Sequence, residues 1–240
     1  DFLITSCCCP VWIKLIETKY PDLLGHISPS VSPMVASGRV IKTLEQAAKV
    51  VFIGPCVAKK SEAALPELAG AIDFVLTFQE LDAIFAAAGI TLADQPDVEN
   101  PQASWGGRVY GRTGGVSAAV EATLKQLVPR RAENFSPLQV DGIPDCQQAM
   151  ESIRHGKLTA NFIEGMACKG GCVGGPGRLL PPIEGAELVN KYGDSSHALT
   201  PVENPHVYSL LVRLGQSEGS NLPELTGESM MAKLLARNLK

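Results

Sequence analysis

Residues 50–56 have the sequence VVFIGPC, a short apolar run that a Gly-Pro pair ends directly before Cys56. A β-branched run of this length, bounded by turn residues, is typical of a buried strand in a parallel sheet. It follows residues 36–48, which we interpret as a helix. The order of helix and strand predicts an α/β protein that has a cysteine at the carboxyl end of a strand.

The alternation of helices and strands continues along the chain. The stretch 94–107 contains Pro, Asn and Gly and indicates a loop or a boundary between two lobes. Residues 170–182 hold five Gly and three Pro, too many for a regular element. The patterns predict strands at 3–4, 50–53, 72–78, 138–140 and 160–163, and helices around 12–20, 36–48, 80–88, 116–128, 146–154, 207–214 and 230–239.

Composition excludes several classes of protein. Of the 240 residues, 45% are hydrophobic and 19% are charged, which is too apolar for intrinsic disorder. The net charge of -4 argues against a protein that binds nucleic acid or an anionic membrane. Since no uncharged apolar run approaches the roughly 18 to 20 residues of a membrane helix, we expect a soluble protein without membrane insertion.

The seven cysteines are the most informative count, because the number is odd and three are consecutive. In a chain of this length they favour an intracellular protein with reduced thiols, some of them committed to metal. The cysteines are Cys7, Cys8, Cys9, Cys56, Cys146, Cys168 and Cys172.

The strongest local signal is the pair Cys168 and Cys172, with glycines between them that let the backbone wrap closely around an ion or a cluster. Zinc is one alternative, although zinc ribbons usually pair two short-spaced cysteine knuckles. Ligands that come singly from distant strand ends suit an iron-sulfur cubane better; the candidates are this pair, Cys56 and one cysteine of the triplet. We interpret Cys146, on an expected helix, as a core residue.

Three segments resemble, in order, the signature segments of the FeFe-hydrogenase catalytic domain. They are TSCCCPVW (5–12), GPCVAKKSE (54–62) and EGMACKGGCVGG (164–175). Because GRTGGV (111–116) and VENP (202–205) are also similar to family segments, the likeness covers nearly the whole chain. The resemblance implies one catalytic domain over residues 1–240. This domain would have two α/β lobes, and each lobe would contain a small, mainly parallel sheet flanked by helices. A metal cluster would lie in the cleft between the lobes.

The resemblance implies cofactors and their ligands. In the family a 4Fe-4S cluster is bridged to a diiron unit that carries CO, cyanide and an azadithiolate. Aligned on the proline and tryptophan of the first segment, Cys8 matches the thiol that passes protons to and from the azadithiolate amine. A ligand must stay a thiolate, whereas a relay must gain and lose its proton near working pH. The implied metal ligands are Cys9, Cys56, Cys168 and Cys172, the last of which bridges the two units.

Four further positions match residues that line the cofactor in the family. Lys59 matches a lysine that donates to a cyanide, and Met166 a methionine packed against the diiron carbonyls. Ser32 aligns with a serine of the site, and Pro55 belongs to the second signature. The plainer alternatives are a solvated lysine, a core methionine and a serine that only forms a turn.

The chain also departs from the family pattern. Three cysteines stand where two are usual, so a shift of one residue would make Cys8 the ligand and Cys7 the relay. Gly54 and Met34 replace a methionine and a glutamine that are common in the family, and the third signature lacks its usual glutamine-proline ending. These changes indicate a divergent branch with altered tuning of the metal site.

The resemblance implies partners as well. The family has a further stretch ahead of the first signature and cysteines for accessory clusters, neither of which this sequence contains. We therefore expect an N-terminal segment or a second chain to complete the site. A low-potential carrier such as ferredoxin, or an electron-transfer subunit, would exchange electrons with it in the cytoplasm.

The favoured function is the reversible reduction of protons to H2. A hydrogen-sensing relative with low turnover is a second hypothesis. A non-catalytic relative in cytosolic iron-sulfur assembly is a third; it generally lacks the relay cysteine, so the extra thiol of the triplet argues against it.

Overall fold

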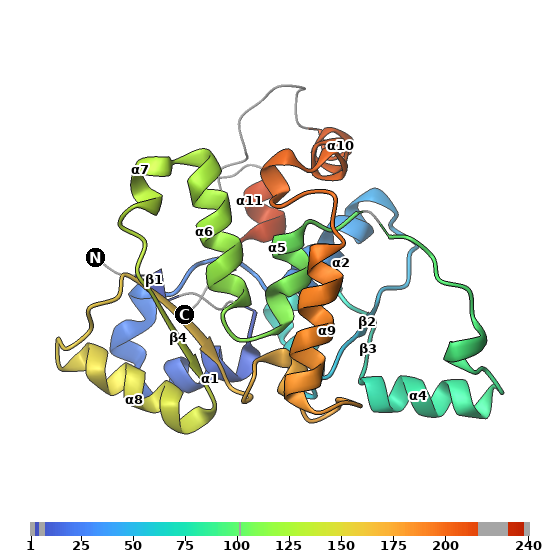
Figure 1. Ribbon diagram of the computed structural model, residues 1–240, viewed down its shortest axis with the longest axis horizontal. Helices are drawn as coiled ribbons and strands as arrows, with labels where there is room; N and C mark the ends of the chain where they lie inside the picture. Colours follow the sequence, from blue (N-terminus) through green and yellow to red (C-terminus); the bar gives the residue numbers. More distant parts are fainter. Residues whose placement is uncertain (1–2, 5–7, 101, 216–229, 238–240) are drawn as a thin grey trace.

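The computed structural model describes residues 3–4, 8–100, 102–215 and 230–237. Its strands form two small sheets, both parallel, and helices surround them (Figure 1). The α/β class with small parallel sheets flanked by helices, expected from the sequence, is confirmed.

The larger sheet has three strands in the order β1 (Leu3–Ile4), β5 (Phe162–Met166) and β4 (Pro137–Asp141). The central strand β5 is buried at all five positions. Burial on both faces explains why its sequence does not alternate between apolar and polar residues. Helix α1 (Pro10–Lys19), the 3-10 helix η1 (Pro21–His26) and helix α8 (Ile143–Arg154) pack with β1 and β5 in the main hydrophobic core.

Trp12 fixes the distance between α1 and the central strand. Its side chain is fully buried, and its ring lies where a β-carbon on Gly165 would stand, 2.4 Å from Trp12 Cε2. The first cysteine segment is therefore held against β5 by a large aromatic side chain that only a glycine accommodates.

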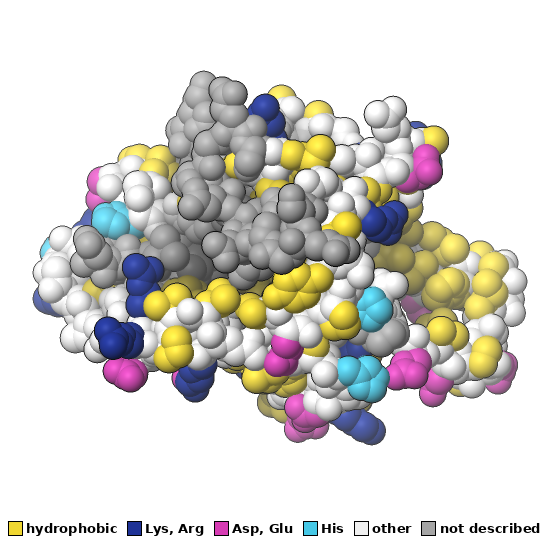
Figure 2. Space-filling view, turned by 90° about the horizontal axis from the view of Figure 1, so that it is seen from above, with side chains coloured by type: hydrophobic (Ala, Val, Ile, Leu, Met, Phe, Trp, Pro, Cys, Tyr) yellow, Lys and Arg dark blue, Asp and Glu magenta, His cyan; other side chains and the backbone are white. Residues whose placement is uncertain are grey.

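The smaller sheet has two strands, β2 (Val51–Ile53) and β3 (Phe74–Leu76), and is covered less completely. Val51 and Phe74 are 44% and 61% exposed. Helix α4 (Phe78–Ala87), which follows β3, has no buried residue and extends from one end of the molecule (Figure 1). Figure 2 shows hydrophobic side chains gathered at this same end.

The remaining helices connect and cover the two sheets. They are α2 (Pro33–Leu44), α3 (Ala58–Ala63), η2 (Pro66–Leu68), η3 (Leu92–Asp94), α5 (Trp105–Arg108), η4 (Val109–Gly111), α6 (Gly115–Leu127), α7 (Pro129–Ala132), η5 (Cys172–Gly174), α9 (Pro182–Asp194), η6 (Pro201–Glu203), α10 (Pro205–Arg213) and α11 (Met230–Leu235).

Most expected elements are present, with shifted ends. Helix α2 begins at Pro33, three residues earlier than expected, because the Ser32 hydroxyl accepts a hydrogen bond from Val35 N and caps it. Strand β5 runs on to Met166, three residues past the expected end at residue 163, because its pairing with β4 continues to Asp141. The last residues of the expected helix 230–239 lie outside the described part of the chain.

Helix α9 was not predicted, and its glycines explain why. Gly185 and Gly193 weaken a helical pattern, but both lie at close contacts. A β-carbon on Gly193 would stand 2.7 Å from Val109 Cγ1, so the glycine lets α9 approach η4. Among the described residues, no helix is both long and apolar enough to cross a membrane.

We expect Gly165→Ala to destabilise the protein by about 1–3 kcal/mol, because the new methyl group must displace the Trp12 ring from a packed core. The free energy of unfolding from denaturant titration measures this. The control is Gly25→Ala, since no atom lies within 4 Å of a β-carbon there; we expect a change below about 0.5 kcal/mol. Equal effects in the two variants would contradict the packing argument.

Candidate metal centre

The three cysteine segments begin where three parallel strands end. Cys9 follows β1, Cys56 follows β2 and Cys168 follows β5. Because β1 and β5 are neighbours in one parallel sheet, the first and third segments leave the same edge. A hydrogen bond from Gly177 N to Pro55 O (2.9 Å) joins the third segment to the second.

Four of the cysteines lie within electrostatic reach of one another. The pKa of Cys172 is raised to about 12, mainly by burial and then by the thiols of Cys9, Cys56 and Cys168, while the Lys59 ammonium opposes the rise. Burial, Cys9 and Cys56 likewise raise the pKa of Cys168. Four thiolates at these positions would repel one another strongly, so the group requires bound positive charge to ionise.

Cys9 belongs to this group, because its thiol interacts through charge with the thiols of Cys56, Cys168 and Cys172. Burial raises the pKa of its thiol, whereas hydrogen bonds from the backbone of Ala167, Trp12 and Val11 lower it. Ala167 belongs to the third segment, and the other two donors lie in the first turn of α1. The Cys9 side chain is thus held between two signature segments by amides that favour its thiolate form.

Glycines let the third segment pack closely against the second segment and against the loop at Thr113. Gly171 has φ +86°, and a β-carbon there would lie 2.6 Å from Thr113 N. A β-carbon on Gly175 would lie 2.4 Å from Pro55 O. Both backbones approach too closely for any larger residue, so these glycines are required by contact with the neighbouring segments.

A fully buried carboxylate anchors the strand that leads to Cys168. Glu164 accepts hydrogen bonds from Gly114 N (2.7 Å), Ser117 N (2.7 Å) and Ser117 Oγ (2.6 Å). These donors lie at the start of α6, where backbone N–H groups lack partners within the helix. No role was expected for Glu164 from the sequence, where its signal is a single acidic residue inside an otherwise apolar strand.

A second carboxylate, Asp141 at the end of β4, fixes the loop between the two cysteines. It accepts hydrogen bonds from Thr113 Oγ1 (2.7 Å) and Gly170 N (3.0 Å) and lies 3.2 Å from Lys169 Nζ. Burial is the largest influence and raises its pKa, but these three donors together hold the pKa of Asp141 below its ordinary 3.8. This residue was also missed by sequence reasoning.

Lys59 is buried, which excludes the alternative of a solvated surface lysine. Its Nζ lies 2.6 Å from Oε2 of Glu62, one turn further along α3, and the Glu62 side chain is fully buried. Both groups take part in an ion pair with little access to water, a placement that is tolerated only when charges are matched.

Cys8 and Met166 lie together in a small apolar cluster beside the thiols. Cys8 is 7% exposed and Met166 1% exposed, and the cluster also contains Val116 and Phe162. Cys9 and Cys172 pack against it. The structure thus brings two predicted site residues into contact with the predicted ligand group.

An apolar cavity of about 510 Å³ adjoins Cys172 and Pro55. Val173, Leu188 and Val189 supply part of its wall, so α9 borders the cavity. A space of this size, with Cys172 in a mainly apolar wall, has the size and polarity of a small-molecule or cofactor site.

The other predicted residues lie as follows. The Ser32 hydroxyl accepts a hydrogen bond from Val35 N and so caps α2; this contact stabilises the start of the helix. Cys146 is fully buried in the main core, as expected for a packing residue; the pKa of its thiol is raised to about 12, chiefly by burial. Cys7 lies outside the described residues.

The thiol group fits an iron-sulfur cluster in chemistry. Cysteine thiolates are the usual ligands of such clusters, and binding would replace the protons that raised pKa values retain on the free thiols. Among the described side chains, no three of His, Cys, Asp or Glu converge closely enough for a single metal ion. The four cysteines interact through charge without meeting at one point.

Comparison with known proteins places the chain among hydrogenases and their relatives. Residues 1–176 match the family described as iron only hydrogenase large subunit, C-terminal domain. The chain is 33% identical over 215 residues to the periplasmic Fe hydrogenase large subunit of Nitratidesulfovibrio vulgaris, a match over 73% of this chain and 51% of that protein. It is 24% identical over 262 residues to cytosolic iron-sulfur assembly component 3 of Rattus norvegicus, over 88% of this chain and 55% of that protein.

The fold agrees with a solved structure, that of an apo FeFe-hydrogenase HydA1 variant from Chlamydomonas reinhardtii. The TM-score is 0.71 at 24% identity, and the match covers 98% of this chain and 75% of that one. The chain spans about half the length, or less, of the curated hydrogenases it matches.

We expect Asp141→Asn to lower the free energy of unfolding at pH 7 by about 1–2 kcal/mol, because charged acceptors form the stronger hydrogen bonds. The folded-state pKa of Asp141 is depressed, so its contribution is present above pH 3.8 and is lost as the pH falls through the lower folded pKa. Urea titrations at several pH values should therefore show the wild type approaching the variant below pH 3.8.

Asp145→Asn is the matched control for this prediction, because Asp145 is half-exposed and pairs with the same Lys169. We expect Asp145→Asn to lower the free energy of unfolding by less than about 0.5 kcal/mol. A stability difference between wild type and Asp141→Asn that does not change with pH would contradict the assignment.

Proposed function

Because the chain belongs to the family of iron-only hydrogenase large subunits, C-terminal domain, we propose that it catalyses the reversible reduction of protons to H2. The observation that carries the proposal is the group of four partly buried cysteines whose thiols interact through charge, with the Lys59 ammonium in reach of one of them. This is the arrangement that an anionic metal cluster requires of its protein: soft ligands and a nearby buried cation.

In this proposal Cys9, Cys56, Cys168 and Cys172 would hold a 4Fe-4S cluster, and Cys172 would also link it to a diiron unit that has CO, cyanide and azadithiolate ligands. When bound, the cofactor supplies the redox chemistry of hydrogen. The charge interactions of Cys9 with Cys56, Cys168 and Cys172 support it as the ligand from the triplet. The apolar cavity beside Cys172 supplies a space with little water next to the bridging ligand.

The remaining site residues act on the bound group from its surroundings. Lys59 would donate a hydrogen bond to an anionic ligand, since its position beside Cys172 directs positive charge to that side. Met166 would contact the cofactor because it packs with Cys8. Pro55 would contact it because it lines the apolar cavity beside Cys172. Ser32 would contribute to the site indirectly, because its hydroxyl caps α2.

Cys8 would carry protons between the cofactor and the protein. The support is its position: it is buried beside Met166, while Cys9 and Cys172 pack against the same cluster. A thiol that is not a ligand can gain and lose a proton, which a metal-bound thiolate cannot do without releasing the metal.

We propose further that the chain functions with partners. A low-potential carrier, such as ferredoxin or an electron-transfer subunit, would exchange electrons with the cubane. A further segment or a second chain would cover the smaller sheet, whose Val51, Ile53 and Phe74 are between 43% and 61% exposed. Residues 94–107 would connect the two lobes of a single catalytic domain, and the protein would act in the cytoplasm, although one relative is named as periplasmic.

A role in iron-sulfur assembly is the second candidate, because the match to the assembly component covers 88% of this chain. The two candidate functions differ in whether the protein carries the diiron unit. Infrared bands of bound CO and cyanide, measured after maturation of the protein, are expected for the hydrogenase. If the matured protein lacks these bands, the assembly role is favoured and catalysis is rejected.

We expect Cys168→Ala to lose the 4Fe-4S cluster on anaerobic reconstitution, because one cluster iron would lack its thiolate. Iron content and the visible absorption spectrum measure this. Cys146→Ala is the control, since it removes a buried thiol that packs in the main core. The ligand assignment is wrong if the two variants bind iron equally.

We expect Cys8→Ala to keep the cubane and the infrared bands and to lose H2 production with a low-potential donor by a factor on the order of 10² to 10⁴. The loss follows because alanine cannot carry a proton. Full activity in this variant would reject Cys8 as the relay, and loss of the cubane would instead identify Cys8 as the ligand.

A further inference from the structure

An arginine, Arg178, follows the third cysteine segment and folds back onto it. Its Nη1 donates hydrogen bonds to the carbonyl oxygens of Gly175 (3.2 Å) and Gly174 (3.3 Å). Gly174 is the last residue of η5, the short 3-10 helix that begins at Cys172. The guanidinium therefore lies at the end of the turn that carries one of the predicted ligands.

Backbone hydrogen bonds fix the loop from which Arg178 extends. Arg178 N donates to Gly175 O (3.2 Å), and Gly177 N donates to Pro55 O (2.9 Å). Gln79, in the first turn of α4, donates from Nε2 to Arg178 O (3.0 Å). Because the loop is joined both to the second cysteine segment and to α4, the fold sets the position of the guanidinium.

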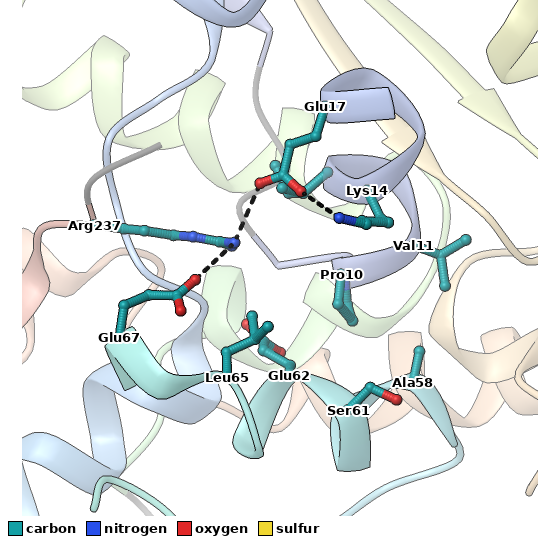
Figure 3. Close-up of a pocket in the computed structure, with 11 residues that line it drawn as sticks. Pro10, Val11, Lys14, Glu17, Ala58, Ser61, Glu62, Leu65, Glu67 and Arg237 are labelled. Carbon is teal, nitrogen blue, oxygen red and sulfur yellow. Dashed lines mark hydrogen bonds and ion pairs between the residues drawn. The ribbon is translucent and has the colours of Figure 1, made fainter. Parts of the chain in front are cut away.

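Other cations that pack beside the cysteine segments are matched by carboxylates. Figure 3 shows one case in a cavity of about 460 Å³ between α1 and α3. There Arg237 Nη2 lies 3.6 Å from Glu17 Oε1 and 4.0 Å from Glu67 Oε1. Lys59 and Lys169 also pair with carboxylates, as described above. The charge of each of these cations is largely cancelled by its partners.

Arg178 differs from these cations. No ion pair within the described ranges includes it, and the side-chain hydrogen bonds that it makes there end on backbone carbonyls. An arginine side chain stays protonated in proteins, and a carbonyl oxygen carries only part of a negative charge. The positive charge of Arg178 is therefore free to act on its surroundings.

Two observations place this charge within reach of the cysteines. Arg178 lines the apolar cavity beside Cys172 and is the one charged residue in the described lining of that cavity. At Cys168, burial is the largest influence and raises the pKa, whereas the Arg178 guanidinium lowers it. Charges interact more strongly across apolar protein than across water, so the cavity wall favours this influence.

We propose that Arg178 tunes the reduction potential of the cluster that the four cysteines would hold, by stabilising the form that carries one more electron. The inference rests on the proposed function, which assigns a 4Fe-4S cluster to these cysteines. In the redox step a low-potential carrier is oxidised by one electron and the cluster is reduced by one, and no bond forms or breaks. A fixed positive charge favours the more negative state, so Arg178 raises the potential.

A simpler role for Arg178 would be to cap the carbonyls at the end of η5. The two roles depend on different properties of the side chain. Capping needs a hydrogen-bond donor, which glutamine also has, whereas tuning needs a positive charge, which lysine also has. The variants Arg178→Gln and Arg178→Lys therefore separate the two roles.

The experiment uses the full chain with a reconstituted cubane and needs no diiron unit. A titration with dithionite and viologen mediators, followed by EPR, measures the ratio of reduced to oxidised cluster at each potential. At the wild-type midpoint we expect Arg178→Gln to lower this ratio about threefold, or about 30 mV, since about 59 mV is a tenfold change for a one-electron couple. Arg178→Lys keeps the charge and should stay close to the wild type. A midpoint that shifts in Arg178→Lys but not in Arg178→Gln would reject the proposal.

Arg130→Gln is the matched control, because it removes one positive charge from an exposed position of α7. Helix α7 leads into the start of β4, whereas the first and third cysteine segments leave the opposite edge of that sheet. We expect the midpoint of this variant to match the wild type. Equal shifts in Arg130→Gln and Arg178→Gln would show that net charge, rather than the position of Arg178, sets the potential, and the proposal would fail.

Salt supplies a second test, because Arg178 is exposed and ions screen its field. The Debye length falls from about 30 Å at 0.01 M to about 3 Å at 1 M ionic strength. The difference in midpoint between the wild type and Arg178→Gln should therefore shrink over this range. A difference that does not change with salt would indicate an altered loop rather than a lost charge, and it overturns the proposal.

Failure of this inference differs from failure of the proposed function. An unchanged midpoint in Arg178→Gln with the cubane bound rejects the tuning role and leaves the ligand assignment intact. If Arg178→Gln binds no cubane although the wild type does, Arg178 is structural and the tuning role is also rejected. An absent cubane in the wild type overturns both proposals, whereas absent CO and cyanide bands after maturation reject the hydrogenase function alone.

Discussion

Four partly buried cysteine thiols within electrostatic reach of one another are the constraint on which the rest of the structure depends. Burial and mutual repulsion raise the pKa values of Cys168 and Cys172, so the apo protein retains protons that a bound cluster must displace. The chain supports this arrangement by drawing the thiols from the ends of different parallel strands. Each segment is then tied to its neighbour through the backbone, as in the hydrogen bond from Gly177 to Pro55.

Two carboxylates, one in the third cysteine segment and one distant from it in sequence, keep the neighbouring segments in place. Glu164 binds the first turn of α6, and Asp141 binds both Thr113 and Gly170. In each case the acceptor lies on a strand of the larger sheet, and its donors lie on a loop or a helix start that contacts the third cysteine segment. A strand is a rigid support, so its carboxylate can hold a glycine-rich loop that has little structure of its own.

The sequence alone was sufficient to predict the helices and strands whose hydrophobic patterns are local. The apolar run at 51–53 and the helical spacing of Trp12 and Leu15 identify β2 and α1, because burial of one face imposes their periods. The anchoring role of Glu164 and the helix α9 depend on contacts between distant residues, and no local pattern reports them. Gly193 weakens α9 by intrinsic propensity, yet its contact with Val109 is what allows the helix to pack.

The two sides of the site differ in how well their polar groups are satisfied, and this difference is informative. On the side of the larger sheet, the two buried carboxylate oxygens of Glu164 share three hydrogen bonds. On the side of α3, Glu62 Oε1 and Arg237 Nε have no hydrogen-bond partner within the described part of the chain, and a cavity lies between the helices that follow two cysteine segments. A tightly packed junction of apolar residues would be more stable there. Local rules are broken mainly where function requires it, so this polar junction, next to the ion pair of Lys59 and Glu62, is a place where the sequence has not been shaped by stability alone.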